Sequence, residues 1–367
     1  MKLNPNWTLC YLVHNFQNNL GMKKLYIYEV KQKAARFLAC KKISDLYRLG
    51  FDTNALQLLA IDPPYYHFEV RKMSGGMRKI EAPKEDLKQI QKQLSDYLQC
   101  VYYSIQSKAA YGYIIRVRAS MHHKNILGNA RQHHGAKYLL NADFKNFFHQ
   151  IKTAEILRIF QTTPFNFNKK TAHLLSRLVT RKGRLPMGAP TSPVLSNIAT
   201  LPLDKALSDW ATQQTFKYTR FVDDLTFSSK NLPINQNHFV DIQELASQYG
   251  FEFNIDKTKL FQEHQTKKVT GLLLNTTIDI DPQFYRAIDK NLKRLKMLVE
   301  VKQLLDNYRP SGLVSEFKQR VDGQINFIGM IEGYDSPEFR KYRKRMERTL
   351  KPSKEVLSAR WVNLSYF

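Results

Sequence analysis

Residues 217–229 read KYTRFVDDLTFSS, two short runs of β-forming residues that meet at a pair of acids, Asp223 and Asp224. This pattern predicts a β-hairpin with the paired acids at its tip. Acids are common turn residues, and on that ground alone an ordinary solvated turn is the simpler interpretation. The flanking residues argue against it, because Phe221, Val222 and Leu225 are apolar where a solvated turn is normally polar. We therefore expect a functional site at this tip.

A third acid, Asp143, ends the apolar run KYLLNAD at residues 137–143, which predicts a buried strand. Mg2+ prefers hard oxygen ligands, and two such ions about 3.5–4 Å apart can activate a hydroxyl and stabilise leaving pyrophosphate. Carboxylates at strand ends satisfy that requirement. Side chains of a strand alternate between faces, so only one of the paired acids shares a face with Asp143 if the strand continues through them. We predict Asp223 as the direct ligand, with Asp224 either supporting it or touching a metal through the turn.

The coarse order along the chain is a helical lead-in, a small β unit, a mixed centre of helices and strands, and a helical basic tail. Asp62-Pro63-Pro64 closes a helical first section, and from Tyr285 to Arg360 the chain is helical and basic, with 18 Lys/Arg against 10 Asp/Glu. The expected elements are helices at 43–49 and 53–59, a hairpin of 66–73 and 77–81 around Ser74-Gly75-Gly76, a helix after Pro83 with apolar residues at 87, 90, 94, 98 and 101, and a strand at 269–275.

The composition points to a polyanionic partner. The 367 residues carry 57 Lys plus Arg against 32 Asp plus Glu, a formal net charge of +25, and a surplus of that size favours phosphate backbones over a merely solvated surface. Cys10, Cys40 and Cys100 show no metal-ligand or disulfide spacing, so we expect reduced core thiols in a cytosolic protein. No signal peptide and no membrane span is expected.

Four motifs resemble those of reverse transcriptases, in the order that family has them. FVDD at 221–224 is similar to the YxDD box, and DFKNFF at 143–148 resembles the first palm motif. Between them, LPMGAPTSPVLSN at 185–197 resembles the LPQGxPxSPxLSN segment. GFEFNIDKT at 250–258 resembles the following motif, which ends in lysine and threonine. Any one of these matches is weak evidence, whereas four in order over about 140 residues are a specific signal.

Two further stretches resemble bacterial retron reverse transcriptases in particular. NARQH at 129–133 matches their NAxxH element, and Val269-Thr270-Gly271 matches their VTG element. The resemblance covers residues 66–275, and GQINFIGMIEG at 323–333 is weakly similar to a thumb segment. It implies an α+β right-hand polymerase whose palm is an antiparallel sheet with helices. The expected domains are a helical lead-in at 1–62, fingers and palm at 63–284, and a basic helical thumb at 285–367.

The resemblance also implies roles for individual residues. Asp143, Asp223 and Asp224 would hold two Mg2+ ions, for which Mn2+ could substitute, with help from the Phe144 carbonyl. The other implied roles are a steric gate against ribonucleotides at Phe148, triphosphate contacts at Arg78 and Lys79, proton donation by Lys257, close backbone approach to template and nucleotide at Gly188 and Pro190, and recognition of RNA at Asn129, His133, Val269, Thr270 and Gly271. Plainer interpretations stay open: a core ring for Phe148, solvated surface charges for Lys79 and Lys257, a structural imidazole for His133, and a buried strand with a glycine bulge for VTG.

Three positions depart from the family pattern. Phe221 stands where the box usually has Tyr, Val222 where retron enzymes often have Ala, and Met187 where Gln is usual. None of these changes removes a metal ligand, so activity is expected to survive. Met187 loses an amide that would contact template or nucleotide, which puts fidelity and nucleotide affinity in question.

The implied function is RNA-directed DNA synthesis from a 2′ hydroxyl of a cognate structured noncoding RNA, giving multicopy single-stranded DNA. The expected partners are that RNA, its RNA–DNA product, dNTPs and an effector protein of antiphage defence. One alternative is another bacterial reverse transcriptase of the group II intron or abortive-infection type, although no nuclease or maturase extension is expected after the thumb. Another is a catalytically silent RNA-binding scaffold for an effector, which the intact acids disfavour. A basic transcription factor lacks any supporting motif.

Overall fold

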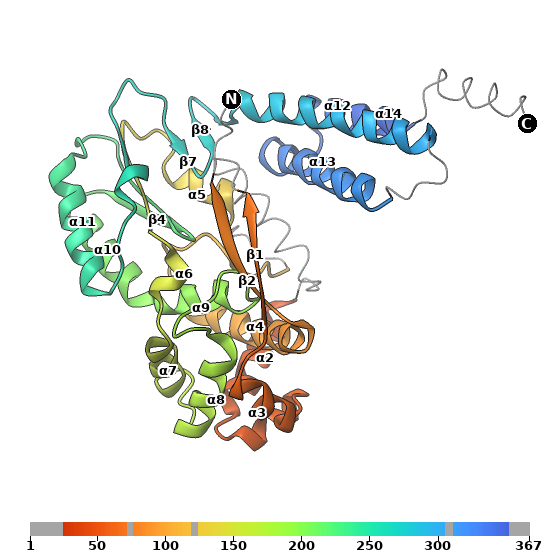
Figure 1. Cartoon of the computed structure of the whole chain (residues 1–367). Helices are drawn as coiled ribbons and strands as arrows, with labels where there is room; N and C mark the ends of the chain where they lie inside the picture. Colours follow the sequence, from red (N-terminus) through yellow and green to blue (C-terminus); the bar gives the residue numbers. More distant parts are fainter. Residues whose placement is uncertain (1–24, 72–75, 119–123, 305–310, 352–367) are drawn as a thin grey trace, which may run out of the picture. The chain divides into compact units, whose positions relative to one another are not determined.

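The computed structural model describes residues 25–71, 76–118, 124–304 and 311–351 (Figure 1). The chain divides into two compact units, one reaching Thr270 and including 274–277, the other formed by 271–273 and the residues from Ile278 onward. Each unit is presented separately below.

The first unit begins with helices and a hairpin. The predicted helices at 43–49 and 53–59 are confirmed, and Asp52 caps the second by accepting hydrogen bonds from the backbone N–H groups of Asn54 and Ala55. The hairpin and the helix after Pro83 are confirmed too, while the turn residues Ser74 and Gly75 lie outside the described residues. The bounds are α2 Ile27–Ala39, η1 Ile43–Leu49, α3 Thr53–Ile61, β1 Tyr65–Arg71, β2 Met77–Pro83 and α4 Glu85–Ile105.

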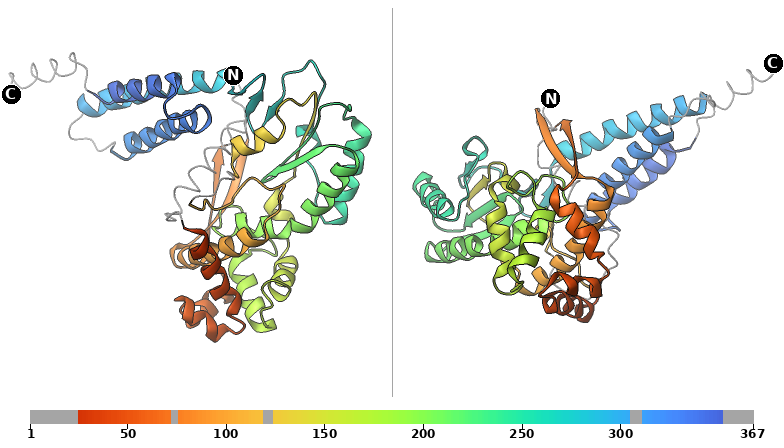
Figure 2. Two further views of the ribbon diagram at one scale, coloured as in Figure 1. Left: turned by 180° about the vertical axis from the view of Figure 1, so that it is seen from behind. Right: turned by 60° about the horizontal axis from the view of Figure 1, so that its bottom comes forward.

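A four-stranded antiparallel sheet forms the centre of this unit, in the order β4-β5-β3-β6. Its strands are β3 Tyr138–Asp143, β4 Lys217–Phe221, β5 Asp224–Ser229 and β6 Lys259–Phe261. Figures 1 and 2 show α10 (Leu201–Gln213) and α11 (Gln236–Gln248) together beside this sheet. Tyr218 and Phe227 are cross-strand partners with stacked rings, and Trp210 of α10 packs edge-on against Phe227. Aromatic burial thus fixes α10 on one face of the sheet.

The remaining helices of this unit lie along the chain between the strands. Their bounds are α5 Ile126–Gln132, α6 Phe147–Gln150, α7 Thr153–Gln161, α8 Lys169–Val179, α9 Ser192–Ala199 and the 3-10 turn η2 Ile255–Lys257. Every residue of α9 is buried, so the segment LPMGAPTSPVLSN ends in the core. The prediction of one strand at 269–275 is wrong: β7 (Lys268–Val269) and β8 (Leu272–Leu274) are separated by Thr270 and Gly271, which both have left-handed φ angles.

The second unit is a bundle of three helices after a short β segment (Figure 1). Its elements are β8 Leu272–Leu274, β9 Ile278–Ile280, α12 Pro282–Leu304, α13 Ser311–Glu332 and α14 Pro337–Thr349. The interior is aliphatic and aromatic, with Ile288, Leu295 and Ile328 fully buried. Tyr285 of α12 stacks on Tyr342 of α14 at 5.7 Å between ring centroids. The predicted helical, basic character of this region is confirmed for its described residues.

Two expectations from composition concern the whole described chain. Cys40 and Cys100 are buried free thiols, as predicted, whereas Cys10 lies outside the described residues. Among the described residues, none of the helices combines the length and apolar character needed to cross a membrane.

Candidate active site

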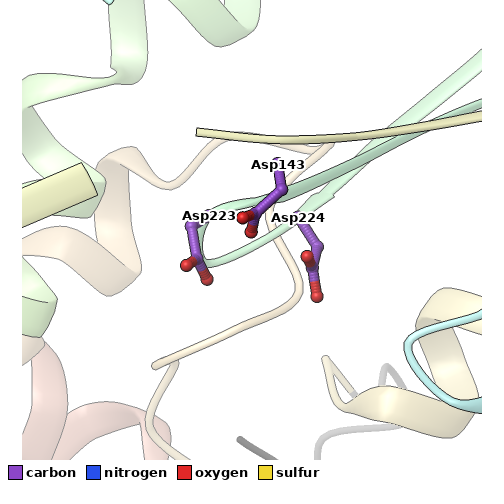
Figure 3. A group of neighbouring side chains, drawn as sticks. All are labelled: Asp143, Asp223 and Asp224. Carbon is purple, nitrogen blue, oxygen red and sulfur yellow. The ribbon is translucent and has the colours of Figure 1, made fainter. Parts of the chain in front are cut away.

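Three carboxylates meet at one end of the four-stranded sheet. Asp143 is the last residue of β3, Asp224 is the first of β5, and the two lie directly opposite each other in the antiparallel ladder. Asp223 belongs to the turn between β4 and β5. One ligand oxygen from each side chain lies within 4.8 Å of the others, and Figure 3 shows the three side chains next to one another. The structure thus brings together the three acids that the sequence singled out.

The argument from strand alternation does not hold at this hairpin. It assumed that the β conformation continues through the paired acids, but β4 ends at Phe221 and β5 begins only at Asp224. Val222 adopts a left-handed φ of 65°, so the chain turns at this point. Asp224 is therefore the cross-strand partner of Asp143, and Asp223 reaches the cluster from the turn. The choice of Asp223 as the direct metal ligand stays a prediction.

The electrostatics of the cluster favour a bound cation. Burial, together with the negative charge of Asp143, raises the pKa of Asp223 to about 7. Burial and the charges of Asp223 and Asp143 also raise the pKa of Asp224 well above its ordinary value. Within the described part of the chain, the enclosed Oδ1 of Asp223 accepts no hydrogen bond. A set of hard, mutually repelling carboxylate oxygens with an open acceptor fits a divalent cation, whose charge would favour the ionised forms.

Lys257 reaches the same cluster from η2. Its ammonium donates a hydrogen bond to Oδ2 of Asp143. Burial opposes the charged ammonium, but that hydrogen bond and the neighbouring carboxylate charges raise the pKa of Lys257. The side chain is thus protonated at neutral pH, which is the state a proton donor needs. Its catalytic role stays a prediction.

Aromatic rings pack around Phe144, the residue that follows Asp143. Phe144 is buried and stacks on Phe147 and Phe253, while its backbone N–H donates to the Asp223 carbonyl at 3.0 Å. Phe148 is only half-buried, and its ring centroid lies 6.4 Å from that of Tyr113. Phe144 therefore links the end of the strand that carries Asp143 to the turn that carries Asp223. Phe148 retains exposed surface beside the site.

Comparison with known proteins identifies this site. The family model described as "Reverse transcriptase (RNA-dependent DNA polymerase)" matches residues 70–274, more than half of the chain and the whole of the carboxylate cluster. The chain belongs to the reverse transcriptase family. It is accordingly an RNA-directed DNA polymerase with the expected α+β polymerase fold, and a reverse transcriptase domain implies dependence on a divalent metal.

The similar curated proteins are retron reverse transcriptases, and this chain is of that type. Retron Mx65 reverse transcriptase of Myxococcus xanthus is 26% identical over 324 residues, covering 81% of this chain and 69% of the relative. Retron Ec86 reverse transcriptase of Escherichia coli is 27% identical over 255 residues, covering 67% and 74%. Retron Mx162 reverse transcriptase of Myxococcus xanthus is 30% identical over 240 residues, covering 58% and 47%.

In this reverse transcriptase, the β1–β2 hairpin brings further charged residues to the site. Arg78 lies close enough to Asp223 that its charge lowers the pKa of that carboxyl, against the larger effects of burial and Asp143. Lys79, the next residue of the strand, points to the opposite face and is exposed. A triphosphate contact by Arg78 fits this geometry, and both assigned roles stay predictions.

Gly188, the glycine of the LPMGAP segment, packs closely against this hairpin. Gly188 has a φ of 125°, and a Cβ there would lie 2.9 Å from the Ile80 side chain and 3.0 Å from the Glu81 carbonyl. The Glu81 N–H also donates to the Met187 carbonyl at 2.8 Å. Gly188 thus permits close approach to β2, and Pro190 beside it is buried. Nucleotide contact by Gly188 and Pro190 stays a prediction.

Two residues that sequence reasoning missed complete this region. Glu81 is 5% exposed and accepts a hydrogen bond from Arg184 at 2.7 Å, which fastens the hairpin to the LPMGAP segment. Its position two residues after the exposed Lys79, on the same face of the strand, carried no hint of burial, because a charged residue on an open hairpin is usually solvated. Tyr113 has a left-handed φ of 57°, and its pKa is raised by burial and by the charge of Asp223. Gly112 before it was the only signal for an unusual backbone here.

The NAxxH element places Asn129 and His133 in the interior of this reverse transcriptase. His133 is 1% exposed, and its ring nitrogens share hydrogen bonds with the hydroxyls of Ser228 at 2.7 Å and Thr219 at 2.6 Å. Burial lowers the pKa of His133 to about 3, so the imidazole is neutral. Asn129 is equally buried. The structural alternative for His133 fits, with strand hydroxyls in place of backbone groups, and RNA contact by Asn129 and His133 stays a prediction without exposed side chains to support it.

The VTG residues are also mostly enclosed. Val269 is fully buried and Thr270 is 6% exposed. Thr270 and Gly271 carry φ angles of 47° and 90°, which a backbone turn requires and which glycine adopts readily. A turn replaces the glycine bulge considered from the sequence, and recognition of RNA by these three residues stays a prediction.

Proposed function

We propose that this retron-type reverse transcriptase extends DNA from a 2′ hydroxyl of its own structured noncoding RNA, producing multicopy single-stranded DNA joined to RNA by a branch. The observation that carries this proposal is the cluster of Asp143, Asp223 and Asp224 in a chain whose relatives are retron reverse transcriptases. The intact carboxylates favour synthesis over a silent RNA-binding scaffold.

In the proposed reaction, the RNA hydroxyl oxygen attacks the α-phosphorus of a dNTP. The bond between the α-phosphorus and the bridging oxygen of the β-phosphate breaks, pyrophosphate leaves, and the hydroxyl proton passes to solvent. The carboxylates would hold Mg2+, with Mn2+ as a possible substitute, and the bound ions supply activation of the hydroxyl and stabilisation of the leaving group. Later additions use the 3′ hydroxyl of the growing DNA.

The other residues of the site divide the remaining tasks. Arg78 would orient the triphosphate through its planar fork, with Lys79 as a neighbouring charge. Lys257 would donate a proton to pyrophosphate, since its pKa is raised by the carboxylates around it. Phe148 would crowd a ribose 2′ hydroxyl from its exposed edge. Residues 63–284 would then act as fingers and palm, and the basic residues 285–367 as a thumb that grips phosphates of the A-like hybrid.

The proposed setting is the bacterial cytoplasm, in a system of antiphage defence with an effector protein encoded nearby. The cognate RNA and its RNA–DNA product would be the stable partners, since a net charge of +25 favours a polyanion.

A co-purification experiment tests this proposal. The protein is purified from its native host with its gene neighbourhood intact, labelled with dNTPs and Mg2+, and the product is treated with ribonuclease. The expected result is a discrete DNA that shortens to a fixed length on ribonuclease treatment and is absent from Asp223→Asn/Asp224→Asn. Synthesis only on an added primer and template would favour a generic bacterial reverse transcriptase. Bound RNA without DNA in either sample would favour the scaffold.

A further inference from the structure

A buried charged cluster lies directly behind the turn that carries Asp223. Its centre is Arg220 of β4, whose side chain is 0% exposed and points to the face of the sheet that α10 covers. Asp204 in the first turn of α10 is equally enclosed, and Asn197 of α9 lies beside it with no exposed surface. A guanidinium in such a place must be fully paired, because an unpaired buried charge is strongly unfavourable.

The guanidinium is held in a fixed orientation. Its Nε donates to Oδ1 of Asp204 at 2.8 Å, and its Nη2 donates to Oδ2 at 2.7 Å, a two-pronged pairing. Burial opposes the charged form, but the Asp204 carboxylate raises the pKa of Arg220 well above its ordinary range. The pairing with Asp204 uses Nε and Nη2, so Nη1 is available to donate to two other acceptors.

Both acceptors of Nη1 belong to residues that form or hold the turn between β4 and β5. One is the backbone carbonyl of Val222 at 3.0 Å, and the other is Oδ1 of Asn197 at 3.1 Å. The amide nitrogen of Asn197 in turn donates to the Gly112 carbonyl at 2.9 Å. Gly112 packs so closely on the turn that a Cβ would lie 2.6 Å from the Val222 side chain. The turn is therefore held through its carbonyl and through its side chain by the same cluster.

The turn needs such support because Val222 has a left-handed φ of 65°, an unfavourable conformation for a β-branched residue. Asp223 follows immediately, and its own carbonyl accepts the Phe144 N–H. A shift of the Val222 carbonyl would thus move the Asp223 carboxylate relative to Asp143 and Asp224. The Arg220 side chain donates hydrogen bonds to Asp204, Asn197 and the Val222 carbonyl, so its influence on the carboxylates passes through the backbone of the turn.

We propose that Arg220 is a positioning residue for nucleotide addition: oriented by Asp204 and Asn197, it fixes the Val222 carbonyl and thereby the place of the Asp223 carboxylate. The proposal rests on the polymerase activity of the chain and does not require the branched product. It predicts that loss of the hydrogen bond between Arg220 and the Val222 carbonyl lowers the rate of chemistry and the response to Mg2+, while binding of RNA is retained.

The test compares Arg220→Lys with Tyr218→Phe in the full chain bound to its RNA. Lysine keeps the charge beside Asp204 but cannot reach Asp204 and the turn together. Tyr218 donates to the same Asp204 Oδ1 at 2.9 Å and is similarly buried, but its hydroxyl makes no contact with the turn, so its loss reports only weakening of the cluster. Single-nucleotide incorporation is measured as kcat and KM for dNTP across a range of Mg2+ concentrations, together with thermal unfolding and RNA binding.

We expect Arg220→Lys to lower kcat at least about thirtyfold and to raise the Mg2+ concentration for half-maximal rate about fivefold or more. RNA affinity should stay within about twofold, and Tyr218→Phe should keep kcat within about threefold at a similar loss of thermal stability. Equal kcat losses in the two variants, each matching the unfolded fraction, would overturn the proposal and leave only a structural ion pair.

Asn197→Ala gives an independent measurement if Arg220→Lys does not fold. It leaves the Arg220–Asp204 pair intact but removes one of the two acceptors of Nη1 and the donor to the Gly112 carbonyl. The same combination of lower kcat and higher Mg2+ requirement is expected. A folded Asn197→Ala enzyme with unchanged kcat and Mg2+ response would contradict the proposal. Failure of RNA-primed synthesis by the unmutated protein would instead count against the proposed function, since incorporation here uses any accepted primer.

Discussion

At the scale of single residues, Val222 is a β-branched residue with a left-handed φ of 65° in the turn beside the site. Left-handed φ angles in residues other than glycine typically cost about 1–3 kcal/mol and persist only where the surroundings enforce them. Here the enforcing contacts are the Arg220 guanidinium on the carbonyl and Gly112 against the side chain. The strain coincides with the residue before the paired acids, so the position of Asp223 depends on packing that the FVDD motif alone does not reveal.

Gly112→Ala should therefore impair catalysis more than folding. A methyl group at this position would lie 2.6 Å from the Val222 Cγ2 and 3.0 Å from its backbone nitrogen, so the turn must move. We expect the rate of nucleotide incorporation to fall at least about tenfold, equivalent to ~1.4 kcal/mol of transition-state stabilisation. Gly183→Ala is the comparison, because its Cβ would meet no atom within 4 Å, although its φ of 78° adds strain. A Gly112→Ala enzyme as active as the parent would show that the turn tolerates displacement.

His133 should make the fold sensitive to acid. Its pKa is about 3 in the folded chain against an ordinary 6.5, because burial disfavours the imidazolium. Below pH 6.5 the unfolded chain binds a proton that the folded chain refuses, so stability present above pH 6.5 is lost as the pH falls toward 3. His133→Gln should remove about 1.4 kcal/mol per pH unit from the slope of unfolding free energy between pH 6 and 4. Chemical denaturation at several pH values measures it.

The exposed neighbour His134 provides the control for that measurement. His134→Gln should leave the slope almost unchanged. Identical slopes for the parent and His133→Gln would mean that the buried imidazole is not the residue whose protonation destabilises the fold.

At the scale of elements, the central sheet has two chemically distinct faces. Leu225 and Phe227 face α10, while Asp224, Thr226 and Ser228 alternate onto the other face. On that face, Thr226 donates to Asn141 at 3.0 Å, and Ser228 bonds to His133. The carboxylate cluster thus lies at the end of a hydrogen-bonded polar row, which explains how it is accommodated on an otherwise well-packed sheet.

The β1–β2 hairpin is attached to the chain around the LPMGAP segment by the Glu81–Arg184 ion pair as well as by the backbone hydrogen bond to Met187. Glu81→Gln should weaken the pairing with Arg184, whose nitrogen lies 2.7 Å from the carboxylate. We expect the unfolding free energy to fall by about 1–3 kcal/mol and KM for dNTP to rise, because the same hairpin carries Arg78. Steady-state kinetics and denaturation of Glu81→Gln and of the exposed Glu69→Gln distinguish this. Equal behaviour of the two variants would contradict the assigned role of Glu81.

Local pattern was sufficient to predict most elements but not the breaks within them. The hairpins at 65–83 and 217–229 follow from alternation and turn residues, and both are present. The interruption at Thr270-Gly271 was missed because a glycine inside a strand pattern is equally compatible with a bulge in one continuous strand. The position of Asp224, rather than Asp223, opposite Asp143 was also not predicted. The turn sets the register, and tertiary contacts from Gly112 and Arg220 set the turn.

At the scale of the whole molecule, the sequence predicted which residues would gather but not the residues that hold them. The roles of the three acids, Lys257 and Arg78 could be predicted from the sequence because they depend on the charge of each side chain and its place in a motif. Glu81, Tyr113 and the pair of Arg220 with Asp204 take their meaning only from burial, which depends on segments distant in sequence. Burial likewise gave His133 a structural environment that the NAxxH motif did not disclose.

The net charge of +25 should make RNA binding strongly dependent on salt. Helix α14 carries the exposed residues Lys341, Lys344 and Arg348. Their joint replacement by glutamine should reduce the slope of log affinity against log salt by about 2–3 if the helix contacts phosphates. Binding titrations between about 50 and 200 mM salt measure this. Lys205→Gln, which breaks a surface pair with Asp209, is the control, and an unchanged slope in the triple variant would place the phosphate contacts elsewhere.

The most direct test of the central claim is single-nucleotide incorporation by Asp143→Asn, Asp223→Asn and Asp224→Asn, each titrated with Mg2+ after removal of metal by a chelator. Bound metal supplies several kcal/mol in such reactions, so each variant should lose about a thousandfold in rate, and chelation should abolish synthesis by the parent. The exposed Asp209→Asn should stay within about twofold. Sustained synthesis by all three variants, or by the chelated parent, would contradict the assignment of the active site to these carboxylates.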